Sequence, residues 1–208
     1  MTPATRDGVR EALLAAARAE LVEHGRAAIS LRAVARRAGL SHAAPKYHFR
    51  DRAGLLTAIA TEGFHALSRA LAQVNESDAR RQLAALGAAY IDFGLANAAL
   101  FELMFAPDHL RADDPELVGA QQQAIGTLST TVRRLMGVDG TSAGTPTLAL
   151  LSWALVHGLV VLTRHGALQA AAGAQASHAI ALAHSLTEVF TEYVGHTLVQ
   201  GAAGDADG

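Results

Sequence analysis

Cysteine is absent from the 208 residues of the chain. Its absence excludes disulfide bonds, thiolate nucleophiles and zinc ribbons, and it fits the reducing cytosol. Lysine occurs once, at Lys46, so arginine carries nearly all of the positive charge. Charges are scattered among the apolar positions of the N-terminal stretch, which is not the pattern of a secretory signal peptide. A cytoplasmic location is predicted.

Long apolar runs are also scarce. The longest uncharged stretch spans residues 140–163, and its apolar part reads "LALLSWALVHGLVV". A membrane-spanning helix needs about 20 apolar residues, and this part is shorter and contains Ser152 and His157. No membrane partner is therefore predicted.

Signatures of metal and catalytic sites are missing. The ten histidines include no pair three or four residues apart, and His-Glu-x-x-His does not occur, so no metal site is predicted. A phosphate loop and a Gly-x-Gly-x-x-Gly turn are absent too, and the one Gly-x-Ser-x-Gly match, residues 140–144, falls in a predicted linker and not between a strand and a helix. The sequence predicts no catalytic residues, no cofactor and no enzyme activity.

Charge is distributed unevenly along the chain. Residues 1–52 hold nine arginines and Lys46 against five acidic residues, a balance of +5, and the remainder has a balance of −7. A basic end joined to an acidic body suggests that the N-terminal part binds a polyanion while the body has another task. Chance clustering of charges on solvated helix faces is the alternative.

Apolar residues recur with helical spacing, and no run alternates as a strand would. An all-α fold of about nine helices is predicted. Ser30, Ser41, Asp51 and Thr145 are the predicted helix caps, with Pro146 at a first helical position. The predicted helices cover about residues 6–24, 31–38, a brief stretch from 41, 52–74, 79–107 (one or two helices), 115–136, 146–165 and 175–199.

Residues 30–49 read "SLRAVARRAGLSHAAPKYHF". Gly39 permits the positive φ of a sharp turn between two helices, and this is the pattern of a helix-turn-helix. The second helix of such a motif can enter the major groove of DNA. Residues predicted to face base edges or phosphates are Ser41, His42, Ala43 and Lys46, with Arg32 placed for a phosphate.

The longer stretch "SLRAVARRAGLSHAAPKYHFRDRAGLL" resembles the DNA-binding domain of TetR-family transcriptional regulators. The resemblance rests on the run from Ala35 to Ser41, the Tyr-His-Phe triplet, and a basic residue followed by Leu-Leu. It implies that Tyr47 and His48 contact the phosphate backbone, that Phe49 locks the short helix onto the first one, and that Arg52 contacts a phosphate. It also implies three N-terminal helices over residues 1–50 and a helical ligand-binding and dimerisation domain over 51–200. The composition of the last residues, "GAAGDADG", predicts a disordered tail over 201–208.

Two features bear on which members of the family the chain resembles. Pro45 and Lys46 replace an apolar residue and an aromatic, and a proline at the fourth helical position is expected to remove one backbone hydrogen bond. Trp153, His157 and Gly158 form a Trp-x-x-x-His-Gly signature similar to C-terminal domains called WHG. Gly158 is expected to allow close approach of another helix.

Aromatic residues and the last helices offer sites for an effector and a second subunit. Residues that could line a small-molecule pocket, or that could simply be core, are Phe64, Tyr90, Phe93, Phe101, Phe105, Trp153 and His157. An apolar face of the last helix, too large to leave exposed, contains Ile180, Ala183, Leu186, Phe190 and Tyr193.

The predicted function is a ligand-responsive transcriptional regulator. By family resemblance it is a repressor that binds a palindromic operator in double-stranded DNA as a homodimer. A small apolar or amphipathic effector, not identified by the sequence, would release it. The alternative is a helical module that binds a small molecule or lipid, or an enzyme, without a specific DNA target.

Overall fold

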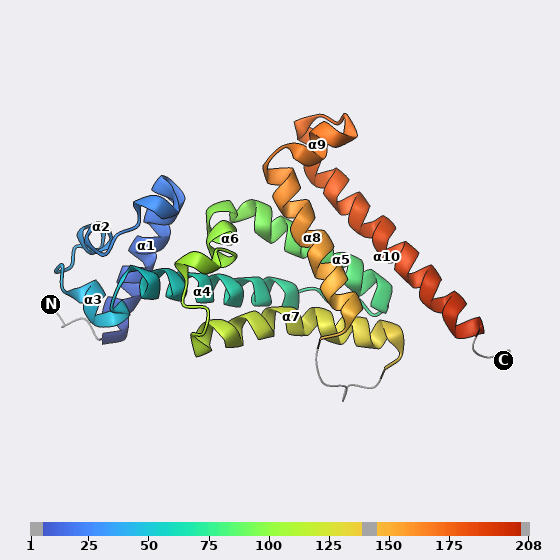
Figure 1. Ribbon diagram of the computed structural model, residues 1–208, viewed down its shortest axis with the longest axis horizontal. Coiled ribbons are helices and arrows are strands. Elements are labelled where there is room, and N and C mark those ends of the chain that lie inside the picture. Colours follow the sequence, from blue (N-terminus) through green and yellow to red (C-terminus); the bar gives the residue numbers. More distant parts are fainter. Residues whose placement is uncertain (1–5, 139–144, 205–208) are drawn as a thin grey trace. The chain divides into compact units, whose positions relative to one another are not determined.

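The computed structural model describes residues 6–138 and 145–204, and of residues 198–204 only the backbone. Within these ranges the chain forms ten α-helices and two short 3-10 helices, which confirms the all-α fold (Figure 1). Contacts divide the chain into two compact units. The first comprises the residues up to 66 together with 97–122, and the second comprises 67–96 together with the residues from 123 onward. The sequence predicted a single domain boundary near residue 50, whereas each of these units combines two separate segments of the chain. The predicted domain boundary stays a prediction.

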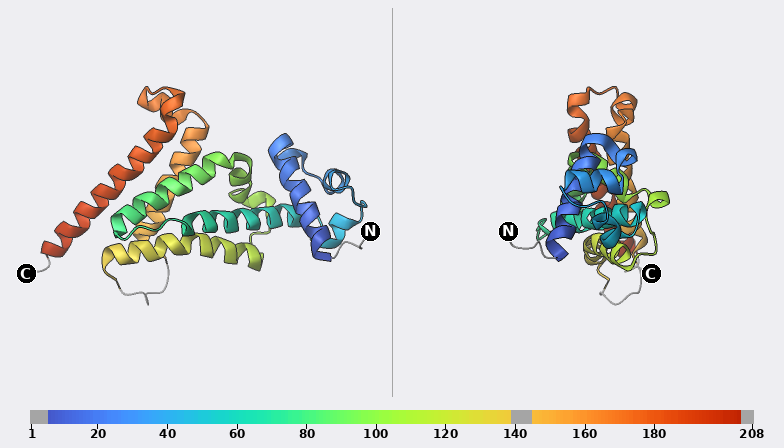
Figure 2. Two further views of the ribbon diagram at one scale, coloured as in Figure 1. Left: turned by 180° about the vertical axis from the view of Figure 1, so that it is seen from behind. Right: turned by 90° about the vertical axis from the view of Figure 1, so that its left-hand side faces the viewer.

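The first unit is built around its N-terminal helix. Its core contains the completely buried side chains of Leu13, Leu14, Val34, Leu55 and Ile59. Helices α2, α3 and α6 each contact α1 (Figures 1 and 2). The segments of this unit are α1 (Arg6–Ala28), α2 (Leu31–Arg37), α3 (Ala44–Phe49), the first part of α4 (Arg52–Ala72), α6 (Ala98–Met104), η1 (Pro107–His109) and the start of α7 (Pro115–Met136).

Three helix boundaries in this unit were predicted from local residues. Gly25 has φ 75° and interrupts the helical geometry of α1 near its end. Ser30 is the N-cap of α2, and its Oγ accepts a hydrogen bond from the Ala33 N–H at 3.2 Å. The Asp51 side chain accepts from the Gly54 N–H at 2.9 Å at the start of α4. Each prediction is confirmed, because a polar cap or a glycine acts within three residues of its own position.

The start of α3 was predicted wrongly. The helix begins at Ala44, its N-cap is Ala43, and Ser41 lies in the preceding turn, where its carbonyl accepts from the Ala44 N–H at 3.1 Å. Pro45 is therefore the second helical residue and not the fourth. The first N–H groups of a helix have no intrahelical acceptor, so Pro45 removes no hydrogen bond there.

The second unit is centred on α5 (Ala79–Ala96), which packs against both α8 and α10 (Figure 1). Short α9 was not predicted, and α10 continues to Gly204, into the segment predicted as a tail; residues 205–208 lie outside the described residues. The other segments are the latter part of α7, α8 (Thr147–Arg164), α9 (Ala167–Ala172), η2 (Ala176–His178) and α10 (Ala179–Gly204).

Among the described helices, α8 is the one that by itself is both long and apolar enough to cross a membrane. Its mean hydropathy of 1.5 over 18 residues would suffice to cross a membrane, a property that core helices of soluble proteins share. Its N-cap is Pro146 and no side chain caps it, so the prediction of Thr145 as cap and Pro146 as first helical residue was wrong. Much of the predicted linker before it, residues 139–144, lies outside the described residues.

Candidate nucleic-acid interface

Helices α2 and α3 and the turn between them form the predicted helix-turn-helix. Ala35 is completely buried, and its carbonyl accepts from the Leu40 N–H at 3.0 Å, which closes the end of α2. Gly39 has φ 65°, a conformation that favours glycine. The tight turn brings the start of α3 next to the end of α2, as a DNA-reading motif requires.

The residues predicted to contact DNA fall into two groups by exposure. Arg32, Ser41, His42, Ala43, Lys46 and Tyr47 are exposed. His48 and Arg52 are half-buried. Because α3 begins only at Ala44, the residues from Ser41 to Ala43 lie in the turn before the helix and not in the helix itself.

The aromatic triplet at the end of α3 contains one buried ring, Phe49, and one exposed ring, Tyr47. Phe49 is 4% exposed and lies under the guanidinium of Arg10, 5.7 Å from the ring centroid, so the predicted lock onto α1 is observed. Tyr47 is 67% exposed, and the Arg6 guanidinium lies 5.3 Å from its ring centroid. Arg6 therefore belongs to the candidate interface. Sequence reasoning missed it, although its position within the basic segment of residues 1–52 was a usable signal.

Arg52 turns its guanidinium inward. Its Nε donates to the Ile29 carbonyl at 2.9 Å, and a terminal nitrogen donates to the Arg26 carbonyl at 2.8 Å. These bonds satisfy carbonyls at and just after the end of α1 and fasten the start of α4 to it. The predicted contact of Arg52 with a DNA phosphate stays a prediction. In the structure, its guanidinium binds backbone carbonyls.

Arg37 holds α2 to α1. It donates from Nε to Glu20 at 2.7 Å and from a terminal nitrogen to Glu23 at 2.7 Å. The hydrogen bonds that Arg37 donates lower the pKa of both carboxyl groups, and the same bonds, to Glu23 first and then to Glu20, raise the pKa of Arg37. This arginine stabilises the scaffold of the motif through its ion pairs with two residues of α1.

The residues predicted to line an effector pocket occur in both units. In the first unit, the rings of Phe64 and Phe101 are buried and lie 5.4 Å and 4.9 Å, centroid to centroid, from Phe105. In the second unit, Tyr90 is buried, and Phe93, Trp153 and His157 are half-buried. Each group is consistent with a role in the core of its own unit, and the ligand-binding role stays a prediction.

A chain of hydrogen bonds joins three of these side chains. The Trp153 Nε1–H donates to the Tyr90 hydroxyl at 3.1 Å, and that hydroxyl lies 3.0 Å from His157 Nδ1. Burial raises the pKa of Tyr90 and lowers the pKa of His157. Both groups are thus uncharged near neutral pH, and the Tyr90 hydroxyl can donate to Nδ1 in the tautomer that carries the imidazole proton on Nε2.

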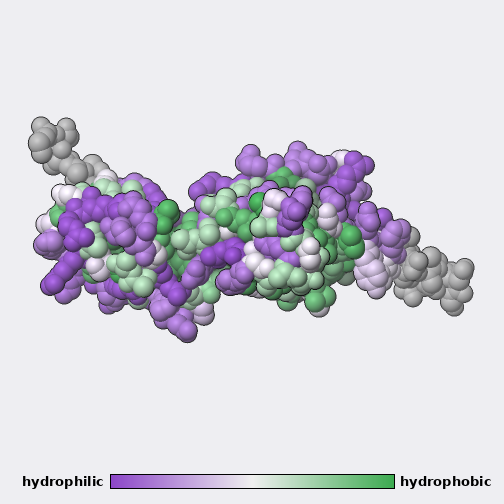
Figure 3. Space-filling view, turned by 90° about the horizontal axis from the view of Figure 1, so that it is seen from above, coloured by the Kyte–Doolittle hydropathy of each residue, from purple (hydrophilic) through white to green (hydrophobic). Residues whose placement is uncertain are grey.

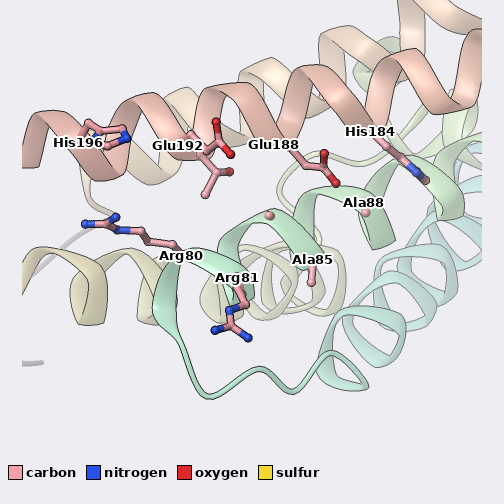
Figure 4. Close-up of a pocket in the computed structure, with 10 residues that line it drawn as sticks. Arg80, Arg81, Ala85, Ala88, His184, Glu188, Glu192 and His196 are labelled. Carbon is pink, nitrogen blue, oxygen red and sulfur yellow. The ribbon is translucent and has the colours of Figure 1, made fainter.

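A groove of about 700 Å³ lies between α5 and α10. His184, Glu188, Glu192 and His196 follow one face of α10 above the alanines of α5, with Arg80 at one end (Figure 4). Arg80 donates to the Gly195 carbonyl at 3.2 Å, and His184 contacts Asp92 at 2.9 Å. None of the predicted ligand-binding residues lines this groove.

The predicted interface residues of α10 do not share one environment. Tyr193, Ile180 and Leu186 are exposed and Phe190 is half-buried, but Ala183 is completely buried within the chain. Hydrophobic surface also lies among polar patches in the space-filling view (Figure 3). Further exposed apolar side chains, which were not predicted, are Leu150, Leu151 and Leu162 of α8 and Val189 of α10.

Two family models match the chain. "Bacterial regulatory proteins, tetR family" matches residues 13–59, which include α2 and α3. "Tetracyclin repressor-like, C-terminal domain" matches residues 83–191. No match was found among curated proteins.

Solved structures similar to the chain include three of interest. A protein of unknown function from Rhodococcus sp. RHA1 is 34% identical with a TM-score of 0.72, covering 90% of this chain and 97% of that one. The TetR family transcriptional regulator PfmR from Thermus thermophilus is 18% identical (TM-score 0.60; 86% and 97% covered). The fatty acid degradation regulator FadR from Bacillus halodurans is 14% identical (TM-score 0.61; 85% and 93% covered).

Proposed function

The chain belongs to the TetR family of transcriptional regulators, and from this premise we propose that it is a repressor that binds a palindromic operator as a homodimer. The family predicted from the sequence is confirmed. Members of this family are not enzymes, so the enzyme alternative falls away. The observation that carries the proposal is the exposure of Lys46 and Tyr47 on a helix whose other face is anchored by Phe49.

Sequence reading is proposed to come from the exposed turn and the first part of α3. Ser41 and His42 offer a hydroxyl and an imidazole, and Ala43 is small enough to let this segment lie deep in the groove. Lys46, Tyr47, His48 and Arg32 would contact phosphates, which set the register of the protein on DNA. One such motif gives limited affinity, so two copies on two half-sites are expected.

The second subunit is proposed to pack on α8 and α10. One stripe of α8 has residues three or four positions apart, as expected for one face of a helix. These residues are Leu151, Ala154, Gly158 and Leu162. A side chain at Gly158 would meet nothing within 4 Å in the chain. Among the described residues of the chain, no helix therefore approaches Gly158 as closely as was expected. We propose that a helix of the partner subunit packs against Gly158. On α10, Leu186, Val189 and Tyr193 supply the matching apolar stripe.

The effector is proposed to be a small apolar or amphipathic molecule. Within the second unit, the ring of Trp153 supports an apolar ligand, with Tyr90 and His157 as the polar groups that contact it. We also propose a WHG-type C-terminal domain, because Trp153 and His157 are joined through Tyr90. Action on chromosomal DNA would place the protein in the cytoplasm.

Selection of genomic fragments tests the DNA-binding proposal. Wild-type protein is expected to retain fragments that share a palindrome, with an affinity that falls steeply with salt. Lys46→Ala should weaken binding about fivefold to tenfold and lower the slope of log K against log salt by about 1 if Lys46 neutralises a phosphate.

The matched control is Arg69→Ala, which removes one positive charge from an exposed position of α4 that no prediction places on DNA. It should bind like the wild type. If micromolar wild-type protein prefers no fragment over bulk DNA, the repressor proposal fails and the alternative of a helical module that binds only a small molecule or lipid takes its place.

A further inference from the structure

The backbone is strained directly after α3. Arg50 has φ 67° and ψ −54°, and among the described residues it is the one non-glycine with a positive φ. The Asp51 N–H donates to the Phe49 carbonyl at 2.8 Å across it, which makes the segment a γ-turn of the rarer, strained form. Such conformations persist only where the surroundings impose them.

Asp51 is held from both sides. One carboxylate oxygen accepts from the Gly54 N–H at 2.9 Å, and the other accepts from a terminal nitrogen of Arg111 at 2.8 Å. The pKa of Asp51 lies below its usual value because of the bond from Gly54, with Arg111 adding to the effect. Asp51 is thus fixed as a carboxylate immediately after the strained residue.

The segment that carries Arg111 is fastened independently of its side chain. The Arg111 backbone N–H donates at 2.9 Å to Oγ1 of Thr57, whose hydroxyl donates to the Ala53 carbonyl at 2.8 Å. Removing the guanidinium would leave these backbone bonds in place. The residue therefore offers a substitution that changes one contact of the turn without detaching the segment.

Gly54 completes the enclosure of the turn. A Cβ at this position would collide with the Phe49 carbonyl and would lie 2.9 Å from a terminal nitrogen of Arg111. The last carbonyl of α3, the first turn of α4 and the guanidinium of Arg111 thus meet at one point. The short helix α3, of six residues, ends at this point.

We propose that Arg111 is a positioning residue for the recognition helix: it holds Asp51 and thereby keeps the strained turn at Arg50, and with it α3, in the DNA-reading orientation. The proposal rests on the proposed function, in which α3 reads DNA. Arg111 itself touches no DNA in this scheme. An exposed ion pair contributes little to global stability, so its removal should change local order and not overall folding.

Two readouts on Arg111→Ala test the proposal, with Arg69→Ala as the control of equal charge. Amide hydrogen exchange of residues 50–55 in the free protein should become at least about threefold faster, with an unchanged melting temperature. Affinity for a fragment selected by the wild type should fall about threefold to tenfold, and the salt slope should stay the same, since no phosphate contact is lost. Arg111→Lys should recover part of both effects.

Each contrary result has a distinct meaning. Unchanged amide exchange at residues 50–55, or unchanged affinity, would overturn the positioning role. A salt slope lowered by about 0.9 would make Arg111 a direct phosphate contact and overturn it as well. If the wild type binds no fragment, the proposed function fails, and the exchange measurement still decides whether Arg111 holds the turn.

Discussion

His157 is the titratable member of the hydrogen-bond chain that includes Trp153 and Tyr90. Burial lowers its pKa below the ordinary value of 6.5, so the unfolded chain binds the proton more readily than the folded one. The contribution of His157 to stability is therefore complete above pH ~6.5 and is lost as the pH falls through its lower folded value.

His157→Asn should remove this pH dependence, because the amide oxygen can accept the Tyr90 hydroxyl proton and does not titrate. Urea unfolding at pH ~8 and pH ~5 is the measurement. The wild type should lose more of its free energy of unfolding than the variant over this range, by a small margin because the side chain is only half-buried. An equal loss in both proteins would show that His157 titrates alike in the folded and unfolded states.

Helical elements were predictable where their ends depend on adjacent residues. Ser30, Gly39 and Asp51 act on their own turn, and their roles follow from residue type. The start of α3 was missed because Ser41 was interpreted as its N-cap. A helix tolerates proline only in its first turn, so Pro45 requires that α3 begin later, at Ala44. Short α9 was missed because six residues between Gly166 and Gly173 carry no amphipathic pattern.

The packing of α5 on α10 depends on one small residue. A Cβ at Gly87 would collide with the methyl group of Thr187 and lie 3.3 Å from a methyl group of Val156. Gly87→Ala should destabilise the protein by about 1–2 kcal/mol in urea unfolding, because overpacking outweighs the better helix propensity of alanine.

The control for this substitution is Gly126→Ala in α7, where a Cβ would meet nothing within 4 Å. It should leave stability unchanged or raise it by up to about 1 kcal/mol. If both variants are equally stable, Gly87 is not needed for the close approach of α10.

At the scale of the molecule, contacts between residues far apart in sequence decide the organisation. Residues 97–122 belong to the unit that contains α1–α3, and Arg111 pairs with Asp51 across 60 positions. Periodicity and caps carry no information about such pairs, so the sequence predicted the DNA-reading motif but not Arg111 or the inward turn of Arg52. The exposure of Leu151 was equally unpredictable, because a uniformly apolar helix does not reveal which face its own chain covers.

The proposed dimer predicts the effect of a charge on α8. Leu151 is 58% exposed, and in the Leu151→Glu variant a two-fold interface would bury one new carboxylate from each subunit without a partner. The dimer dissociation constant should rise at least about 100-fold, equivalent to about 3 kcal/mol, and operator binding should fall with it. Val22→Glu, at a 75% exposed position of α1, is the matched control and should remain dimeric. Light scattering after size exclusion measures both variants, and a dimeric Leu151→Glu protein would place the subunit contact on another surface.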